Sequence, residues 1–130
     1  MSTPHTITVT HTLTPEFLQD IMTTAVESSY EWFNFDHVER IKGGDRHLSV
    51  TAFDALEVDC DGDGAILSTT AINAEKIVAA MTKIIADGLV PQYHRDTIAC
   101  ACAASDASDI DMDLADCILQ VACFDELRYG

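Results

Sequence analysis

The chain has 130 residues, of which 48% are hydrophobic, so we expect one folded domain over residues 1–130 rather than a disordered chain. Its 22 acidic residues outnumber its 7 lysines and arginines, which gives a formal net charge of −15. A surface of that charge repels phosphate groups, so we expect no binding to nucleic acid or to an anionic membrane. No stretch is apolar for long enough to span a bilayer, and no signal peptide is visible.

Cysteine usage indicates a reducing compartment. The number of cysteines is 5, which is odd, and most of them have apolar or helical neighbours. We therefore expect all of them to be reduced and to act as small hydrophobic side chains in a cytoplasm. They are Cys60, Cys100, Cys102, Cys117 and Cys123.

The N-terminal third predicts one strand and one helix. Residues 5–13 alternate between apolar and threonine positions, which is typical of a β-strand. Thr14 and Pro15 then predict a helix start, and the helix is expected to run to about Phe33. Residues 34–46 read as a connection. The predicted buried stripe of this helix includes Leu18, Ile21, Met22, Ala25 and Ser29.

The middle of the chain predicts a hairpin followed by a helix. Residues 47–58 look extended, residues 59–64 form a turn, and residues 65–69 are a plausible returning strand. Residues 71–87 have helical periodicity, with Asn73 as a candidate N-cap and Gly88 as a stop signal. The predicted buried stripe of this helix is Ile77, Val78, Met81, Ile84 and Ile85.

The C-terminal third predicts two helices. Alanines favour a helix over residues 94–104, and a polar break follows at residues 105–108. The last helix is expected to start with Ser108 or Asp109 as its N-cap and to end the chain. Its apolar face is predicted to hold Leu114, Ala115, Ile118, Leu119, Ala122 and Cys123. Its solvated face is predicted to hold Asp113, Asp116 and Gln120.

These elements predict an α+β fold with the order β-α-β-β-α-(α)-α. We expect a small antiparallel sheet of about three strands. Three to four helices should pack against this sheet.

Metal and catalytic motifs are incomplete. Asp59, Asp61 and Asp63 match the front of a calcium-binding EF-hand loop, but Thr70 stands where a bidentate glutamate is needed. A hairpin turn explains the same aspartates and glycines at residues 59–64. No Cys-x-x-Cys pair predicts zinc, and no cysteine or serine carries a nucleophile signature. We therefore predict no metal, no cofactor and no catalytic residue.

Four aromatic residues lie within six positions, at Tyr30, Trp32, Phe33 and Phe35. A helix end buried in the core is one interpretation of them. They cannot all share one helical face, so we also regard this patch as a candidate contact between subunits of a homo-oligomer.

A family resemblance rests on Ile7-Thr-Val-Thr, Leu13 to Ile21 with Ala25-Val-Glu and Tyr30-Glu-Trp, Ile72 to Val78, and the ending Asp109 to Gly130. Together these segments resemble small proteins of bacteriophages that infect actinobacteria. The resemblance covers nearly the whole chain, and the ending is its most specific part. It implies a phage origin and a setting in the host cytoplasm, and it gives no residue a role.

Two functional hypotheses follow. The first is a non-enzymatic accessory protein whose acidic face binds a basic host protein and could mask a nucleic-acid-binding surface on it. The residues expected to carry it are Asp59, Asp61, Asp63, Asp106, Asp109, Asp111, Asp113 and Asp116. The second is a small-ligand binder or enzyme whose site forms in three dimensions, for example at a subunit interface. A pocket that joins His94 or His11 to Cys100 would favour it.

Overall fold

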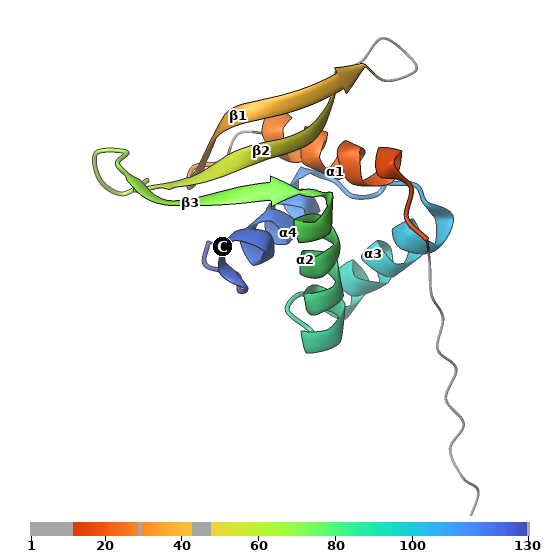
Figure 1. The fold of residues 1–130 in the computed structure, drawn as a ribbon. Coiled ribbons are helices and arrows are strands. Elements are labelled where there is room, and N and C mark those ends of the chain that lie inside the picture. The colour runs from red at the N-terminus through yellow and green to blue at the C-terminus, as the bar shows by residue number, and fades with distance from the viewer. Residues whose placement is uncertain (1–11, 29, 43–47, 130) are drawn as a thin grey trace, which may run out of the picture.

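The computed structural model describes residues 12–28, 30–42 and 48–129. Over these residues the chain forms an antiparallel sheet with the strand order β1-β2-β3, together with four helices (Figure 1). The elements are α1 (Pro15–Glu27), β1 (Phe33–Lys42), β2 (Leu48–Val58), β3 (Ile66–Asn73), α2 (Ala74–Asp87), α3 (Gln92–Ala104) and α4 (Met112–Phe124). The predicted α+β class is confirmed. The strand predicted over residues 5–13 lies outside the described residues, except that Thr12 and Leu13 are not in a strand.

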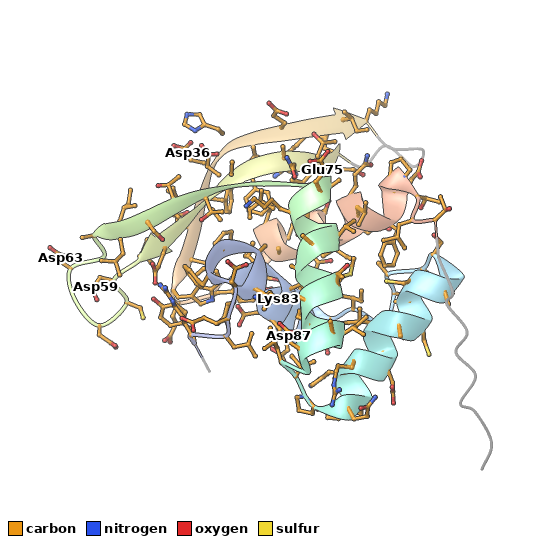
Figure 2. All side chains as sticks on the ribbon, turned by 60° about the horizontal axis from the view of Figure 1, so that its bottom comes forward. Asp36, Asp59, Asp63, Glu75, Lys83 and Asp87 are labelled. Atoms are coloured by element: carbon orange, nitrogen blue, oxygen red, sulfur yellow. The ribbon has the colours of Figure 1, made fainter. Side chains whose placement is uncertain are left out.

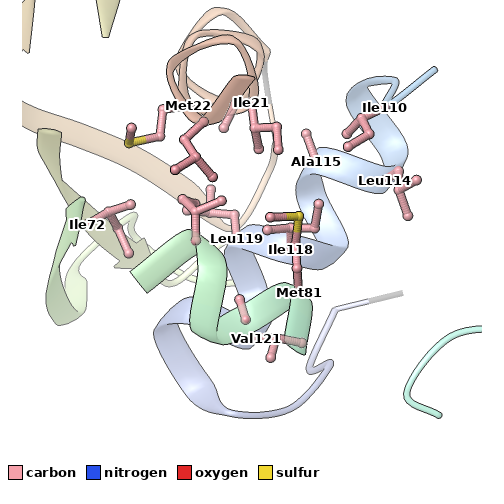
Figure 3. Close-up of a cluster of buried hydrophobic side chains, with 14 of the residues drawn as sticks. Ile21, Met22, Ile72, Met81, Ile110, Leu114, Ala115, Ile118, Leu119 and Val121 are labelled. Atoms are coloured by element: carbon pink, nitrogen blue, oxygen red, sulfur yellow. The ribbon is translucent and has the colours of Figure 1, made fainter. Parts of the chain in front are cut away.

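The core lies between the sheet and three helices. Helices α1, α2 and α4 cover one face of the sheet, and α3 packs beside α2 (Figure 1). Ile118 and Leu119 of α4 are 0% exposed and lie among side chains of α1, α2 and β3, including Met22, Met81 and Ile72 (Figure 3). Helix α4 is therefore the element around which the core is built.

Local sequence signals set several helix ends as predicted. The Thr14 hydroxyl accepts a hydrogen bond from the backbone N–H of Phe17 at 3.2 Å, and Asn73 caps α2 by accepting from Lys76 N–H at 3.0 Å. Gly88 ends α2 with a positive φ of 63°, a conformation that costs glycine little. These caps satisfy backbone groups that the first and last helical turns leave free.

Both ends of α4 differ from the prediction, because the helix begins at Met112 and ends at Phe124 instead of continuing to the end of the chain. Asp111, rather than Ser108 or Asp109, is the N-cap, and its carboxylate accepts from Leu114 N–H at 2.9 Å. The helix starts later than predicted because Ile110, the residue before the cap, is packed into the core and is only 4% exposed. The buried face is confirmed for the first four of its six predicted members, Leu114, Ala115, Ile118 and Leu119, whereas Ala122 and Cys123 are only partly buried.

The predicted ends of the first helix and of the connection after it were wrong. Helix α1 ends at Glu27, and residues 33–42 form β1 instead of a loop. The side chains of β1 do not alternate regularly between apolar and polar residues. The reason is that the pairing with β2 shifts between Asp36 and Arg40, where His37 has a positive φ of 49°. It is also an edge strand, and charged side chains are common on edges because they discourage pairing with other chains.

The predicted start of α2 and the predicted burial of two of its residues were also wrong. Residues 71–73 extend β3, so α2 begins at Ala74. Ile77, Met81 and Ile84 are buried as predicted. Val78 and Ile85 are 37% and 41% exposed, because only one side of α2 faces the core.

Replacing Asp125 by glycine should stabilise the fold. Asp125 ends α4 with a φ of 60°, and its N–H donates to the Val121 carbonyl at 2.9 Å. Side chains with a Cβ adopt this left-handed conformation at a cost, so Asp125→Gly should raise the free energy of unfolding by about 0.5–1 kcal/mol in urea titrations. The control Asp109→Gly introduces glycine where φ is not positive, and it should not stabilise the fold. Lower stability of Asp125→Gly would contradict this assignment.

Candidate functional site

The candidate site is a pocket of about 300 Å³ that brings together four segments of the chain. Two of its walls come from the segment before β1 and from the β2–β3 hairpin, and the others come from α4 and the residues after it. The lining residues are Tyr30, Glu31, Trp32, Cys60, Asp116 and Tyr129. None of these side chains is basic.

Aromatic rings form one side of the pocket. Trp32 is only 3% exposed, and its ring is nearly parallel to those of Tyr30 and Tyr129, with centroid distances of 6.4 and 5.5 Å. The Tyr30 hydroxyl donates to the backbone carbonyl of Met112 at 2.6 Å. This bond fixes the aromatic residues to the first turn of α4.

Asp116 is held in one orientation inside this pocket. Its Oδ1 accepts from the indole Nε1–H of Trp32 at 2.8 Å and from the side-chain amide of Gln120 at 3.1 Å. Within the described residues, Oδ2 has no hydrogen-bond partner and Asp116 forms no ion pair. A half-buried carboxylate therefore has one oxygen fixed by the fold and one free to accept.

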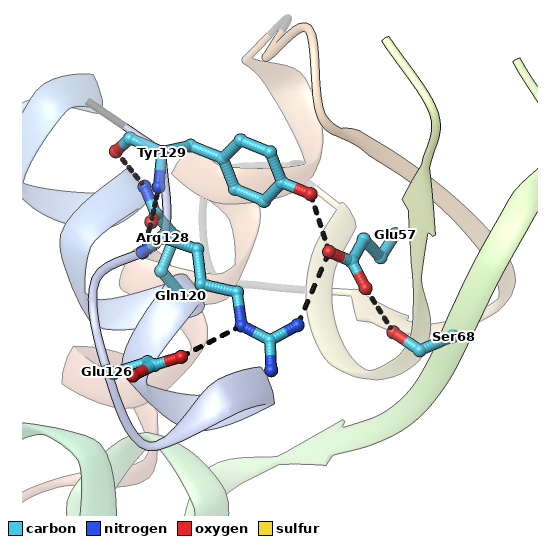
Figure 4. Close-up of polar contacts among 6 residues, drawn as sticks. All are labelled: Glu57, Ser68, Gln120, Glu126, Arg128 and Tyr129. Carbon is cyan, nitrogen blue, oxygen red and sulfur yellow. Dashed lines mark hydrogen bonds and ion pairs between the residues drawn. The ribbon is translucent and has the colours of Figure 1, made fainter. Parts of the chain in front are cut away.

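Gln120 attaches the end of the chain to α4. The prediction that it lies on the solvated face was wrong, because it is 1% exposed. Its Oε1 accepts from the N–H groups of Arg128 and Tyr129 at 2.9 and 2.8 Å, and its Nε2 donates to the Tyr129 carbonyl at 3.0 Å (Figure 4). Gln120 thus places Tyr129 where its ring can form a pocket wall.

Glu57 anchors the other end of Tyr129. This β2 carboxylate is 7% exposed and accepts from the Tyr129 hydroxyl and from the Ser68 hydroxyl, the latter at 2.9 Å (Figure 4). Arg128 approaches it at 3.5 Å. The hydrogen bond from Tyr129 is the main cause that lowers the pKa of Glu57, against the opposing effect of burial. The same bond is the main cause that raises the pKa of Tyr129 to about 12.

Acid should remove the stabilisation that Glu57 provides. A carboxyl whose pKa is lower in the folded chain stabilises the fold above its ordinary pKa of 4.5, and it loses that contribution as the pH falls through the folded pKa. Urea unfolding should therefore show Glu57→Gln to be less stable than the wild type at pH 7. The difference should shrink toward zero near pH 3. An equal difference at both pH values would contradict this role for the carboxylate.

Carboxylates near the pocket make its surroundings negative. Burial is the largest cause that raises the pKa of Tyr30 to about 12, and the charges of Asp116 and Asp113 raise it further. Burial likewise raises the pKa of the Cys117 thiol, with additional contributions from Asp116, Asp113 and Asp111. Of these three predicted binding acids Asp116 lines the pocket, whereas Asp111 and Asp113 lie outside its lining and act on neighbouring groups from the start of α4.

The acids of the hairpin lie next to this region. Asp59 and Asp63 lie on the β2–β3 hairpin, which extends beyond the helices (Figure 2). Asp61 is exposed between them, and Cys60 lines the pocket itself. Asp63 also accepts from the Ala65 N–H at 3.1 Å, so it helps to shape the turn.

The last two predicted acids are not brought to the pocket. Asp106 and Asp109 are exposed in the connection between α3 and α4, and neither lines the pocket. The hydrogen bond from the Ser108 hydroxyl is the main cause that lowers the pKa of Asp106, and the Ser108 N–H, which donates to the same carboxylate at 2.9 Å, lowers it further. Asp106 therefore has a local structural role.

The turn at residues 59–64 is a hairpin connection. The Asp59 N–H donates to the Ala65 carbonyl at 2.9 Å, and Gly64 has a positive φ of 77°. Among the described residues, no three His, Cys, Asp or Glu side chains are grouped closely enough to hold a metal ion. Neither His94 nor Cys100 lines any of the four pockets found over the described residues. His11 is not among the described residues.

The aromatic patch predicted from the sequence is partly internal. Trp32 and Phe33 are 3% and 8% exposed, whereas Tyr30 is half-buried and Phe35 is 37% exposed. A subunit contact through this patch therefore stays a prediction that depends on Tyr30 and Phe35. The signal that could have indicated the pocket is the clustering of the single tryptophan of the chain with other aromatic residues.

Comparisons with known proteins give no relative: no protein-family model, curated protein or solved structure matches the chain. Within the described ranges, no helix is both long and apolar enough to cross a membrane.

Proposed function

We propose that the chain is a non-enzymatic accessory protein of a bacteriophage that binds a basic protein of its host. Such binding could mask a nucleic-acid-binding surface in the host cytoplasm. The observation that carries the proposal is the pocket beside α4, where the carboxylates of Glu31 and Asp116 lie among aromatic rings with no basic side chain in the lining. A basic partner gains attraction at such a surface and is guided to it from a distance.

Three of the cationic side chains make their contacts with groups other than the acids of the pocket. Arg128 is engaged by Glu57 and Glu126, at 3.5 and 3.0 Å, and Arg95 donates to a backbone carbonyl. Lys83 lies 3.9 Å from Asp87 on α2, which does not contribute to the pocket. None of these contacts is made to Glu31, to Asp116 or to the acids of the β2–β3 hairpin.

Capture of a host protein tests the proposal. The immobilised full-length chain should retain a basic protein from an actinobacterial lysate, and mass spectrometry would identify it. Raising the salt from about 0.1 M to about 1 M shortens the screening length from about 10 Å to about 3 Å, so capture should be lost. Neutralising the hairpin acids as Asp59→Asn, Asp61→Asn and Asp63→Asn should weaken capture.

A matched variant controls for net charge. It removes three carboxylates elsewhere on the surface, as Asp20→Asn, Asp87→Asn and Asp96→Asn, and it should capture nearly as much as the wild type. Equal loss in both triple variants would show that only total charge matters. Capture that is insensitive to salt, or limited to acidic proteins, would contradict the proposal.

A second candidate function is the binding of a small apolar ligand. It is favoured by a hollow of about 400 Å³ between α2 and α3, lined mainly by apolar side chains. Val78, Met81 and Ile85 contribute from α2, and Ala99 and Cys102 contribute from α3. Thermal melting with a set of small hydrophobic compounds would reveal such a ligand as a rise in melting temperature.

A further inference from the structure

We propose that the pocket beside α4 binds the guanidinium group of a single arginine side chain on the partner protein. This inference rests on the proposed function, because it names the group by which a basic partner would be recognised. The pocket combines aromatic rings, a fixed carboxylate and a second acid at one place. Each of the three features has a complementary part in an arginine side chain.

The carboxylate of Asp116 supplies a preorganised acceptor. Trp32 and Gln120 both donate to its Oδ1, at 2.8 and 3.1 Å, so the orientation of the group is set before any ligand arrives. Its Oδ2 accepts no hydrogen bond from the described residues. An N–H of a guanidinium group can bond this oxygen without breaking an existing contact. Because the carboxylate is already ordered, binding loses little side-chain entropy.

Aromatic rings favour arginine over lysine. Tyr30, Trp32 and Tyr129 line the pocket with ring planes within 6° of parallel for the two pairs that include Trp32. A guanidinium group is planar, stacks on aromatic rings and is more weakly hydrated than an ammonium group, so it loses less on entering such a site. The pocket volume of about 300 Å³ accommodates one such side chain.

Glu31 supplies a second negative charge at the rim. It is exposed, and it forms no ion pair within the described residues. Because its side chain is in water, a change there alters the charge of the pocket without disturbing the core. Glu31 is therefore the residue at which the electrostatic part of the proposal can be tested apart from stability.

The chain contains one tryptophan, so its indole N–H gives a single, assignable NMR signal inside the pocket. The full-length protein would be titrated with Nα-acetyl-arginine methylamide, and with the lysine and the citrulline derivatives. The citrulline side chain matches arginine in shape but is neutral. Arginine should shift the Trp32 signal to saturation, with citrulline about tenfold weaker and lysine several-fold weaker.

Two variants and one control complete the experiment. Glu31→Gln and Asp116→Asn should each weaken arginine binding by about fivefold or more, whereas Glu39→Gln on β1 removes the same charge away from the pocket and should change it less than twofold. Each variant is compared with its own unliganded spectrum, and Glu31→Gln keeps the test valid if Asp116→Asn folds poorly.

The outcomes separate this inference from the proposed function. Equal effects of arginine and citrulline, equal effects of arginine and lysine, or no difference between Glu31→Gln and Glu39→Gln would overturn the guanidinium site. Salt-sensitive capture of a basic host protein could still succeed in that case, because an acidic surface does not need this pocket. If arginine binds but no basic protein is captured, the guanidinium site is supported and the proposed function is contradicted.

Discussion

Replacing Ile118 by alanine should lower the free energy of unfolding by about 2–5 kcal/mol, the range typical of a buried isoleucine that leaves a cavity. Ile118 is 0% exposed at the centre of α4, where α1 and α2 meet that helix (Figure 3). A small domain has only about 5–15 kcal/mol of stability in total, so the variant should show a much lower midpoint in urea.

Asp113→Asn on the same helix is the matched comparison. Asp113 is exposed, so its variant should stay within about 0.5 kcal/mol of the wild type. If Asp113→Asn unfolds more easily than Ile118→Ala, the assignment of the buried face of α4 is wrong.

Replacing Gln120 by alanine should lower the free energy of unfolding by about 2–3 kcal/mol, because several hydrogen bonds at a buried amide are lost together. Two backbone N–H groups and one carbonyl of Arg128 and Tyr129 bond to this side chain. Without them, the residues after α4 should detach and the Tyr129 ring should leave Trp32. The fluorescence of the single tryptophan should then shift before the chain unfolds.

Gln92→Ala is the control for Gln120→Ala. Gln92 is exposed, and over the described part of the chain its side chain bonds to Asp96 alone, so its loss should cost little. Unchanged tryptophan fluorescence and unchanged stability in Gln120→Ala would show that the end of the chain is held by other contacts, such as the bond between Tyr129 and Glu57.

The parts of the fold that the sequence predicted correctly depend on neighbours in the sequence. Thr14, Asn73 and Gly88 mark helix ends because a cap bonds to backbone groups within a few residues. The stripe of Ile77, Met81 and Ile84 repeats at helical spacing, so one face of α2 could be assigned to the core. Such signals require no knowledge of the rest of the chain.

The parts that the sequence did not predict depend on tertiary context. Strand β1 is an edge strand with irregular pairing around His37, so its side chains follow no regular alternation. Val78 and Ile85 look as apolar as their neighbours, and only the direction from which the sheet and α4 approach decides that they stay exposed.

The candidate site is assembled from distant residues. Trp32 and Asp116 are 84 positions apart, and Glu57 and Tyr129 are 72 positions apart, so no local motif could join them. Asp116 was predicted from the charge pattern alone. Gln120 was placed on the wrong face because a glutamine is usually solvated, although it stands in an apolar run between Leu119 and Val121.

The most direct measurement of the central claim is the salt dependence of the affinity for the captured host protein. Kd would be determined for the wild type and for the variant with Asp59→Asn, Asp61→Asn and Asp63→Asn. Between about 0.05 M and about 0.5 M salt, the wild-type affinity should fall by about tenfold or more, because screening weakens attraction between opposite charges. The variant should bind more weakly at low salt and lose less as salt is added. Equal affinities and equal slopes for the two proteins would contradict recognition of a basic partner by these acidic residues.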